Sequence, residues 1–149
     1  MSAATETLKG DALRRKIERD NEDLVRRFNQ AWSNKDVDGI VALVADDVKY
    51  MVHEGGRTVD GKAELITVLT DFMKLWDRIH FEVLKIHVIG PLVVHERTED
   101  YYGKDGHPDW HFWIAAMLVI QDGKIRIWRD YSMPGKQQVW AHPAGRPAS

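Results

Sequence analysis

The spacing of apolar residues along this chain changes from a helical to a strand pattern near residue 79. Before that point apolar side chains recur every three to four positions, which predicts three helices, at 11–33, 37–47 and 61–79. After it, β-branched and aromatic residues dominate four segments separated by turn residues, at 80–90, 91–102, 109–121 and 124–133. Helices followed by such a meander predict an α+β fold, with the helices covering one face of an antiparallel sheet.

The remaining segments complete a single domain over residues 1–149. "VKYMVHE" at 48–54 predicts a short strand, and "GGRTVDG" at 55–61 predicts a loop. The polar run at 20–23 can interrupt the first helix, so residues 1–20 are predicted to form a separate lead-in helix. Residues 135–149 are rich in proline, glycine and alanine and are predicted to be an irregular tail.

Composition excludes several classes of protein. The absence of cysteine rules out disulfides, thiol nucleophiles and Cys-ligated metal sites, and it fits a reducing compartment. The net charge is −2 and the cations are scattered, so no nucleic-acid partner is expected. No segment approaches the roughly 20 apolar residues of a membrane span, and the N-terminus lacks the apolar core of a signal peptide. We therefore expect a cytoplasmic protein that does not bind membranes.

Two of the predicted strands carry charged residues on both faces, which a half-buried strand normally does not. In "LVVHERTEDYY", alternation places His95, Arg97, Glu99 and Tyr101 on one face. In "KIRIWRDYSM", each face combines a large apolar or aromatic residue with a charged one, Asp130 among them. Two interpretations are open at this point: solvated edges with surface ion pairs, or a polar site shared by the two strands.

These same segments, "VVHERTEDYY" and "MLVIQDGKIRIWRDYS", resemble the limonene-1,2-epoxide hydrolase family. That family belongs to the wider SnoaL-like and nuclear transport factor 2 (NTF2)-like group. It pairs an E-R-x-D strand, present here at 96–99 with glutamate in the last position, with a G-K-I-x-x-W-R-D-Y strand, present at 123–131. The resemblance extends over most of residues 20–133. It implies an NTF2-like cone, with a curved sheet wrapped around the three N-terminal helices, and a homodimer without a cofactor.

Carried over by position, the resemblance implies that Arg97 lies between Glu99 and Asp130 at the bottom of a deep apolar pocket. In the family one carboxylate activates a water that attacks an epoxide carbon, and the other protonates the epoxide oxygen. Asp130 is then the base, Glu99 the acid, and Tyr50 helps to hold the water. Two carboxyl groups in a dry pocket do not both ionise readily, so such a pair can supply an acid and a base at one pH.

The sequence departs from the family pattern at two positions. Glu99 replaces an aspartate, and its extra methylene matters where a displacement of about 1 Å is costly. Val52 replaces the water-holding asparagine that follows the tyrosine by two residues, and His53 comes directly after it. His53 is therefore a candidate base or donor for another substrate.

The pocket wall and the outer strand face are also predicted. From their faces and from family positions, four residues are expected to line the pocket: Trp32, Tyr101, Phe112 and Ile114. Arg97, Glu99 and Tyr101 are expected to face the cavity. The alternating residues are expected to face solvent or a partner: Glu96, Thr98 and Asp100. His111 is predicted to be packed rather than a ligand, and no metal-binding motif is present, so no metal is expected.

Three hypotheses for function follow. The first is a cofactor-free hydrolase acting on an epoxide of an apolar or aromatic small molecule. The second is a lyase, dehydratase or isomerase that uses His53 on an aromatic compound in the same cavity. Val52 and the six tryptophans motivate this alternative. The third is a non-catalytic module that binds an apolar ligand.

Overall fold

Three helices and six strands make up the computed structural model, which describes residues 3–132. In chain order they are α1 (Ala3–Ser33), α2 (Val37–Ala42), β1 (Val44–Met51), β2 (Thr58–Asp60), α3 (Lys62–Met73), β3 (Trp76–Ile89), β4 (Leu92–Gly103), β5 (Trp110–Gln121) and β6 (Lys124–Ser132). The tail predicted at 135–149 lies outside the described residues.

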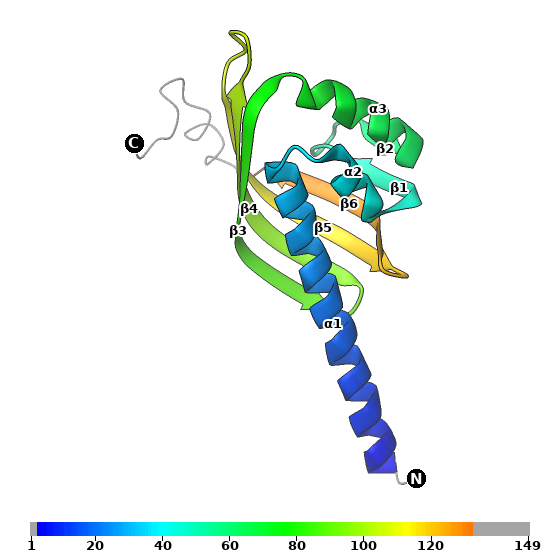
Figure 1. Cartoon of the computed structure of the whole chain (residues 1–149). Coiled ribbons are helices and arrows are strands. Elements are labelled where there is room, and N and C mark those ends of the chain that lie inside the picture. The colour runs from blue at the N-terminus through cyan, green and yellow to red at the C-terminus, as the bar shows by residue number, and fades with distance from the viewer. Residues whose placement is uncertain (1–2, 133–149) are drawn as a thin grey trace.

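The six strands form one sheet in the order β2-β1-β6-β5-β4-β3. Every neighbouring pair is antiparallel except β1 and β6, which run parallel. Figure 1 shows the sheet curving around the C-terminal half of α1, with α2 and α3 gathered near one end. The α+β class and the curved, mainly antiparallel sheet are thus confirmed, while the parallel β1–β6 contact was not foreseen.

Helix α1 is continuous, so the prediction of a separate lead-in helix at 1–20 is wrong. The polar run at 20–23 is compatible with helix because its members have partners. Asn21 is buried, and its amide donates to the carbonyl oxygen of Gly90 at 2.9 Å, which fastens the helix to the β3–β4 turn. Asp23 accepts from Arg27 one turn later at 2.9 Å, a spacing that supports a helix.

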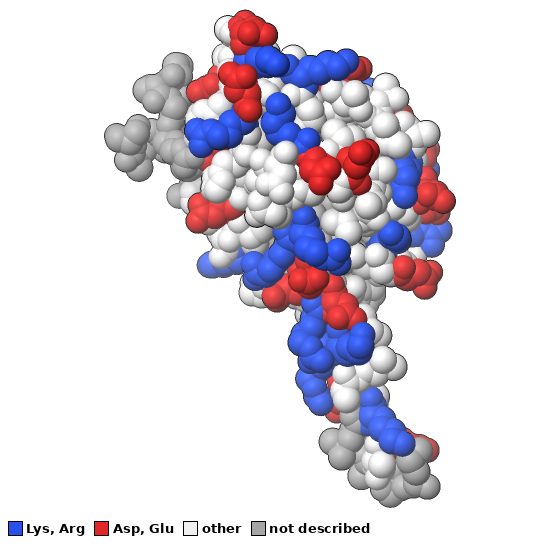
Figure 2. Space-filling view, viewed as in Figure 1, with Lys and Arg blue, Asp and Glu red and all other residues white. Residues whose placement is uncertain are grey.

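The two halves of α1 differ in burial. From Leu24 onward the helix buries an apolar stripe that includes Phe28 and Trp32. Before that point the predicted stripe is exposed, with 59 % of Leu13 accessible to solvent. Figure 1 shows this N-terminal half projecting beyond the sheet, and Figure 2 shows cationic and anionic side chains interleaved along it. No helix within residues 3–132 combines the length and the apolar character needed to span a bilayer.

Two predicted helices end earlier than expected. The segment 37–47 is helical only to Ala42, because the Ile125 amide donates to the Leu43 carbonyl oxygen at 2.9 Å and Val44 pairs with β6. The third helix ends at Met73, and Trp76 opens β3 instead of closing the helix. Short apolar runs fit both a helix and a buried strand, so the sequence pattern alone could not place these boundaries. The predicted loop at 55–61 also contains the short strand β2.

An irregular register in β6 explains why both of its faces looked mixed. Val119 pairs with Ile127 but Ile120 pairs with Ile125, so Arg126 is an extra residue, as in a β-bulge. Ile125 is therefore buried before the bulge, while Trp128 and Asp130 are buried after it. The bulge turns Asp130 toward the concave side of the sheet.

Candidate active site

The inner face of β4 carries four buried polar or aromatic residues in alternation: His95, Arg97, Glu99 and Tyr101. The predicted assignment of this face agrees with the structure. The outer face is closed at two of its three predicted positions, because Thr98 and Asp100 are buried within the chain itself, so the expectation that they face solvent or a partner is wrong. Asp100 is buried because it lies opposite His111 on β5 and pairs with its Nδ1 at 2.7 Å. His111 is itself buried, in agreement with the prediction of a packed histidine.

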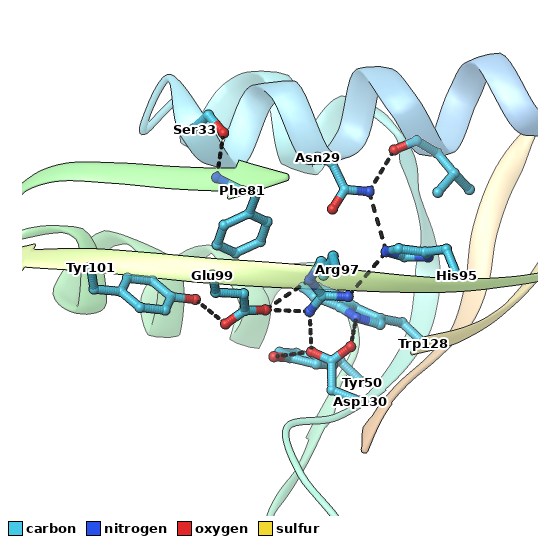
Figure 3. Close-up of polar contacts among 11 residues, drawn as sticks. Asn29, Ser33, Tyr50, Phe81, His95, Arg97, Glu99, Tyr101, Trp128 and Asp130 are labelled. Atoms are coloured by element: carbon cyan, nitrogen blue, oxygen red, sulfur yellow. Dashed lines mark hydrogen bonds and ion pairs between the residues drawn. The ribbon is translucent and has the colours of Figure 1, made fainter. Parts of the chain in front are cut away.

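Arg97 bridges two carboxylates. Its Nε donates to Glu99 Oε1 at 2.8 Å, and its Nη2 contacts the same oxygen. Nη2 also reaches Asp130 Oδ2 at 3.0 Å. Figure 3 shows the guanidinium between the two acids, which come from β4 and β6 on either side of β5. The structure therefore brings together the three charged residues that the sequence had singled out on separate strands.

Asp130 has two further donors besides Arg97. The indole Nε1 of Trp128 donates to Oδ1 at 3.0 Å, and the Tyr50 hydroxyl donates to Oδ2 at 3.1 Å. Tyr50 and Trp128 lie opposite each other on β1 and β6, and their rings stack with centroids 3.5 Å apart. The parallel β1–β6 contact thus positions both donors on one carboxylate. Burial, followed by the charge of Asp130, raises the pKa of Tyr50 well above its ordinary value, so Tyr50 is a neutral donor.

Glu99 has different surroundings at its two oxygens. Oε1 receives Arg97, whereas Oε2 accepts from the Tyr101 hydroxyl at 2.7 Å. Burial raises the pKa of Glu99; Arg97 opposes this effect, and the nearby charge of Asp130 adds to it. Burial and the charge of Glu99 likewise raise the pKa of Tyr101 well above its ordinary range. Glu99 is therefore suited to hold a proton.

Arg97 also contacts a neutral histidine, His95. Arg97 Nη1 lies 3.1 Å from His95 Nε2, and because a guanidinium can only donate, Nε2 must accept. Burial and then the charge of Arg97 lower the pKa of His95 well below 6.5, which agrees with this assignment. Burial lowers the pKa of Arg97, but the two carboxylates raise it by more, so Arg97 stays cationic. The sequence places His95 on the correct face but gives no sign of this role.

A cavity of about 380 Å³ opens beside these groups. Eight of its lining residues were predicted as site residues: Trp32, Tyr50, His53, Glu99, Tyr101, Phe112, Ile114 and Asp130. Six others were not: Val52, Val68, Leu69, Phe72, Trp110 and Ser132. Arg97 lies behind the carboxylates and does not line the cavity. Most of the lining is apolar or aromatic, and the two carboxylates are its acidic members.

Three of the six unforeseen wall residues come from α3. Val68, Leu69 and Phe72 reach the cavity because the helix packs across one end of the sheet (Figure 1). Phe72 makes an edge contact with the Tyr101 ring, with centroids 5.4 Å apart. The apolar stripe of this helix was visible in the sequence, but which part of it meets the cavity depends on the tertiary packing.

Val52 and His53 both line the cavity, in different surroundings. Val52 packs against the core, whereas His53 is exposed and its Nδ1 lies 3.1 Å from the carbonyl oxygen of Glu54. The hydrogen bonds found for His53 within residues 3–132 do not join it to Glu99 or Asp130. Across that part of the chain, no three histidine, cysteine or acidic side chains are grouped so as to hold a metal ion.

The family model for the SnoaL-like domain matches residues 25–128, and the chain belongs to this family. It is 34 % identical over 110 residues to the epoxide hydrolase EphG of Mycobacterium tuberculosis (strain ATCC 25618 / H37Rv), covering 72 % of this chain and 69 % of that protein. Among solved structures, an M. tuberculosis LEH-like epoxide hydrolase has a TM-score of 0.62 at 29 % identity, covering 74 % of this chain and 80 % of the other.

A more distant neighbour is SalBIII, described as an epoxide hydrolase/cyclase-like enzyme in pyran ring formation. It has a TM-score of 0.70 at 14 % identity, covering 78 % of this chain and 93 % of the other, and shows the fold alone. Solved structures described as an NTF2-like protein and as a ketosteroid isomerase-like fold match with TM-scores of 0.66 and 0.67, which confirms the NTF2-like fold expected from the sequence. The similarity to EphG and to the LEH-like epoxide hydrolase supports an enzyme of the epoxide hydrolase type.

Proposed function

We propose that this protein is a cofactor-free hydrolase that opens the epoxide of an apolar or aromatic small molecule. The observation that carries this proposal is the buried Arg97 shared by Glu99 and Asp130, both of which line the cavity. An acid and a base at one site are what epoxide opening by water requires, since one oxygen gains a proton while another loses one. The similarity to EphG supports the same reaction class.

Asp130 is the proposed base. It is surrounded by three donors, one of them cationic, which suits a carboxylate that takes a proton from water. Tyr50 lines the cavity beside it and helps to hold that water. As the water oxygen bonds to an epoxide carbon and its proton passes to Asp130, the carbon–oxygen bond of the ring breaks.

Glu99 is the proposed source of the proton for the leaving oxygen. Its raised pKa favours the protonated form, and Arg97 holds its carboxyl group in place. The product is a diol, in which one oxygen comes from the epoxide and the other from water. Arg97 stays cationic throughout and fixes the relative positions of acid and base.

The cavity limits the size and character of the substrate. A volume of about 380 Å³ lies at the small end of the range of ligand pockets. Trp32 stacks on Phe81 with centroids 5.2 Å apart, and Phe72 and Phe112 each make an edge contact with Tyr101. Such rigid ring walls favour a compact apolar or aromatic molecule with one polar group at the acidic end.

Isotope labelling tests this proposal. Styrene oxide, cyclohexene oxide and limonene oxide are incubated with the wild type and with Asp130→Asn in ¹⁸O-labelled water, and the products are analysed by mass spectrometry. The wild type is expected to give a diol with one labelled oxygen, and the variant to give almost none. The proposal is wrong if the wild type converts no epoxide of such a panel into a labelled diol.

A second candidate is a lyase, dehydratase, isomerase or cyclase reaction in the same cavity, which takes no oxygen from water. The apolar Val52 favours it, because the relatives that this sequence resembles hold their water there with an asparagine. An unlabelled product in the isotope experiment would support this candidate. Full activity of His53→Ala in such a reaction would show that His53 has no catalytic role. The exposure of His53 favours that outcome.

The remaining expectations are tested separately. A non-catalytic module would bind an apolar ligand without turnover, and Arg97→Lys would leave that affinity unchanged.

The homodimer expected from the resemblance is tested by light scattering of the purified protein, in which a monomer mass near 17.2 kDa would contradict it.

A further inference from the structure

The two oxygens of Glu99 cannot exchange roles, because different donors surround them. Oε1 receives Nε of Arg97 at 2.8 Å and also contacts Nη2. A guanidinium has no acceptor, so a hydrogen placed on Oε1 would point at donors and find no partner. When Glu99 is protonated, its hydrogen therefore lies on Oε2.

That hydrogen lies between Oε2 of Glu99 and the hydroxyl oxygen of Tyr101. Oε2 and the Tyr101 hydroxyl oxygen are 2.7 Å apart, and a dashed line joins the two groups in Figure 3. With Glu99 ionised, the tyrosine donates to Oε2; with Glu99 protonated, Oε2 donates and the tyrosine oxygen accepts. In this second state the hydrogen of the tyrosine hydroxyl must turn away from Glu99. Because Tyr101 lines the cavity, that hydrogen can turn toward a bound molecule.

We propose that Tyr101 is the catalytic residue that protonates the leaving oxygen, while Glu99 replaces the proton in the same step. This inference rests on the proposed function. As the epoxide carbon–oxygen bond breaks, the Tyr101 hydrogen passes to the ring oxygen and the Oε2 hydrogen of Glu99 passes to Tyr101. The water proton passes to Asp130, so this step leaves Glu99 ionised, Asp130 protonated and Tyr101 unchanged. Loss of the Asp130 proton to solvent and uptake of one by Glu99 then restore the starting enzyme.

The surroundings of Tyr101 suit this relay. Its ring is held by Phe72, Trp76 and Phe81, with centroids between 5.0 and 5.8 Å away, so rotation of the hydroxyl hydrogen needs no movement of the ring. Burial raises the pKa of Tyr101 well above its ordinary value, so the hydroxyl keeps its hydrogen until Glu99 supplies another.

Kinetics of Tyr101→Phe test the relay, with Tyr102→Phe as the matched control on the opposite face of β4. The substrate is whichever epoxide of the panel the wild type hydrolyses fastest. Loss of a proton donor is expected to lower kcat by about 100-fold or more, while KM rises by no more than about fivefold, the worth of one hydrogen bond, and the control keeps the wild-type kcat. In mixtures of H₂O and D₂O, the wild-type rate is expected to curve with deuterium content because two protons move on the acid side. Tyr101→Phe should be closer to linear.

Wild-type kcat in Tyr101→Phe would overturn the relay but not the proposed function. If Tyr101→Phe does not fold, difluorotyrosine at position 101 keeps both the ring and the hydroxyl. Since fluorination changes the acidity of the hydroxyl that would deliver the proton, kcat on the plateau below the pKa of Glu99 should differ from the wild-type value, and an unchanged plateau would overturn the relay.

A binding experiment gives a result that does not depend on turnover. In Glu99→Gln, Arg97 retains the amide oxygen at Oε1, and the amide NH₂ donates to Tyr101, so the tyrosine hydrogen points into the cavity. Acetophenone offers a carbonyl oxygen in place of the epoxide oxygen. We expect Glu99→Gln to bind acetophenone about fivefold more tightly than Glu99→Gln/Tyr101→Phe, the worth of one hydrogen bond. Equal affinity would overturn the inference, even if the wild type hydrolysed no epoxide.

Discussion

The two faces of β4 both bury charged side chains, but they use them differently. On the inner face, Arg97 joins Glu99 to Asp130, and the Trp128 indole donates to Asp130 at 3.0 Å. On the outer face, Asp100 pairs with His111 at 2.7 Å, and an indole donates to Glu96 at 2.6 Å. The two faces therefore contain similar partners at similar distances, a carboxylate with a basic group and a carboxylate with a tryptophan.

The difference lies in what the carboxylates can reach. Glu99 and Asp130 line the cavity, whereas Glu96 and Asp100 are not among its lining residues. On the inner face one cation is shared by two acids, so one of them can remain protonated beside a space that admits a ligand. A buried charge alone thus does not indicate a functional site. The indication here is a buried cation beside a cavity, shared by two acids that have different hydrogen-bond partners.

Substitution of one aspartate on each face tests this comparison most directly. Asp130→Asn is expected to lower epoxide turnover by about 100-fold to 10 000-fold, the usual contribution of a general base. Asp100→Asn is expected to keep the wild-type turnover, because its partner His111 lies on the other side of the sheet from the cavity. Initial rates with the labelled-water assay measure both. An equal loss in the two variants would contradict the division between the faces.

Removal of the shared cation is expected to have the largest effect on stability. Arg97→Met leaves two buried carboxyl groups without their partner, which should lower the free energy of unfolding by about 3–5 kcal/mol. Adding Glu99→Gln and Asp130→Asn to the same chain should restore most of this loss, because no charge is then stranded. Urea denaturation at pH 7 measures both. A triple variant as unstable as Arg97→Met would show that the loss comes from packing instead.

The raised pKa of Glu99 predicts how the stability and the activity of the protein change with pH. Burial raises the pKa of Glu99 above 4.5, so the folded protein holds this proton more tightly than the unfolded chain does. The resulting stabilisation is present at acid pH and is lost as the pH rises from about 4.5 through the raised pKa. The acid is lost over the same interval, so kcat/KM should fall there. Unfolding curves at several pH values measure the first effect, and Glu99→Gln should lack it. Parallel curves for the two proteins would contradict the prediction.

The smallest expected effects come from the two tryptophans that donate to carboxylates. Trp128→Phe removes a donor from the proposed base and should lower turnover by about tenfold. Trp113→Phe removes the bond to Glu96 and should leave turnover unchanged. Each change should cost about 1.5–3 kcal/mol of stability, the usual worth of a hydrogen bond to a charged group. Loss of turnover in Trp113→Phe would show that the outer face also influences the site.

Much of the site could be predicted because strand alternation and the family motifs can be recognised within short segments of the sequence. Alternation alone grouped Arg97, Glu99 and Tyr101 on one face of β4. The remaining parts depend on long-range contacts. The roles of His95 and Trp128 depend on hydrogen bonds to Arg97 and Asp130, which only the folded chain brings close to them. Phe72 joined the cavity wall because α3 packs over it.

The sequence by itself determined the class of fold, the helix-then-strand order and the three charged residues of the site, because these depend on local periodicity and on short motifs. Only the tertiary structure decided that α1 is unbroken, that β1 lies parallel to β6 and that Asp100 is buried. Each of these depends on a partner in another element of the fold: Gly90 for Asn21, Ile125 for Val44, and His111 for Asp100. Periodicity reports which face a residue takes, and it carries no information about what lies opposite that face.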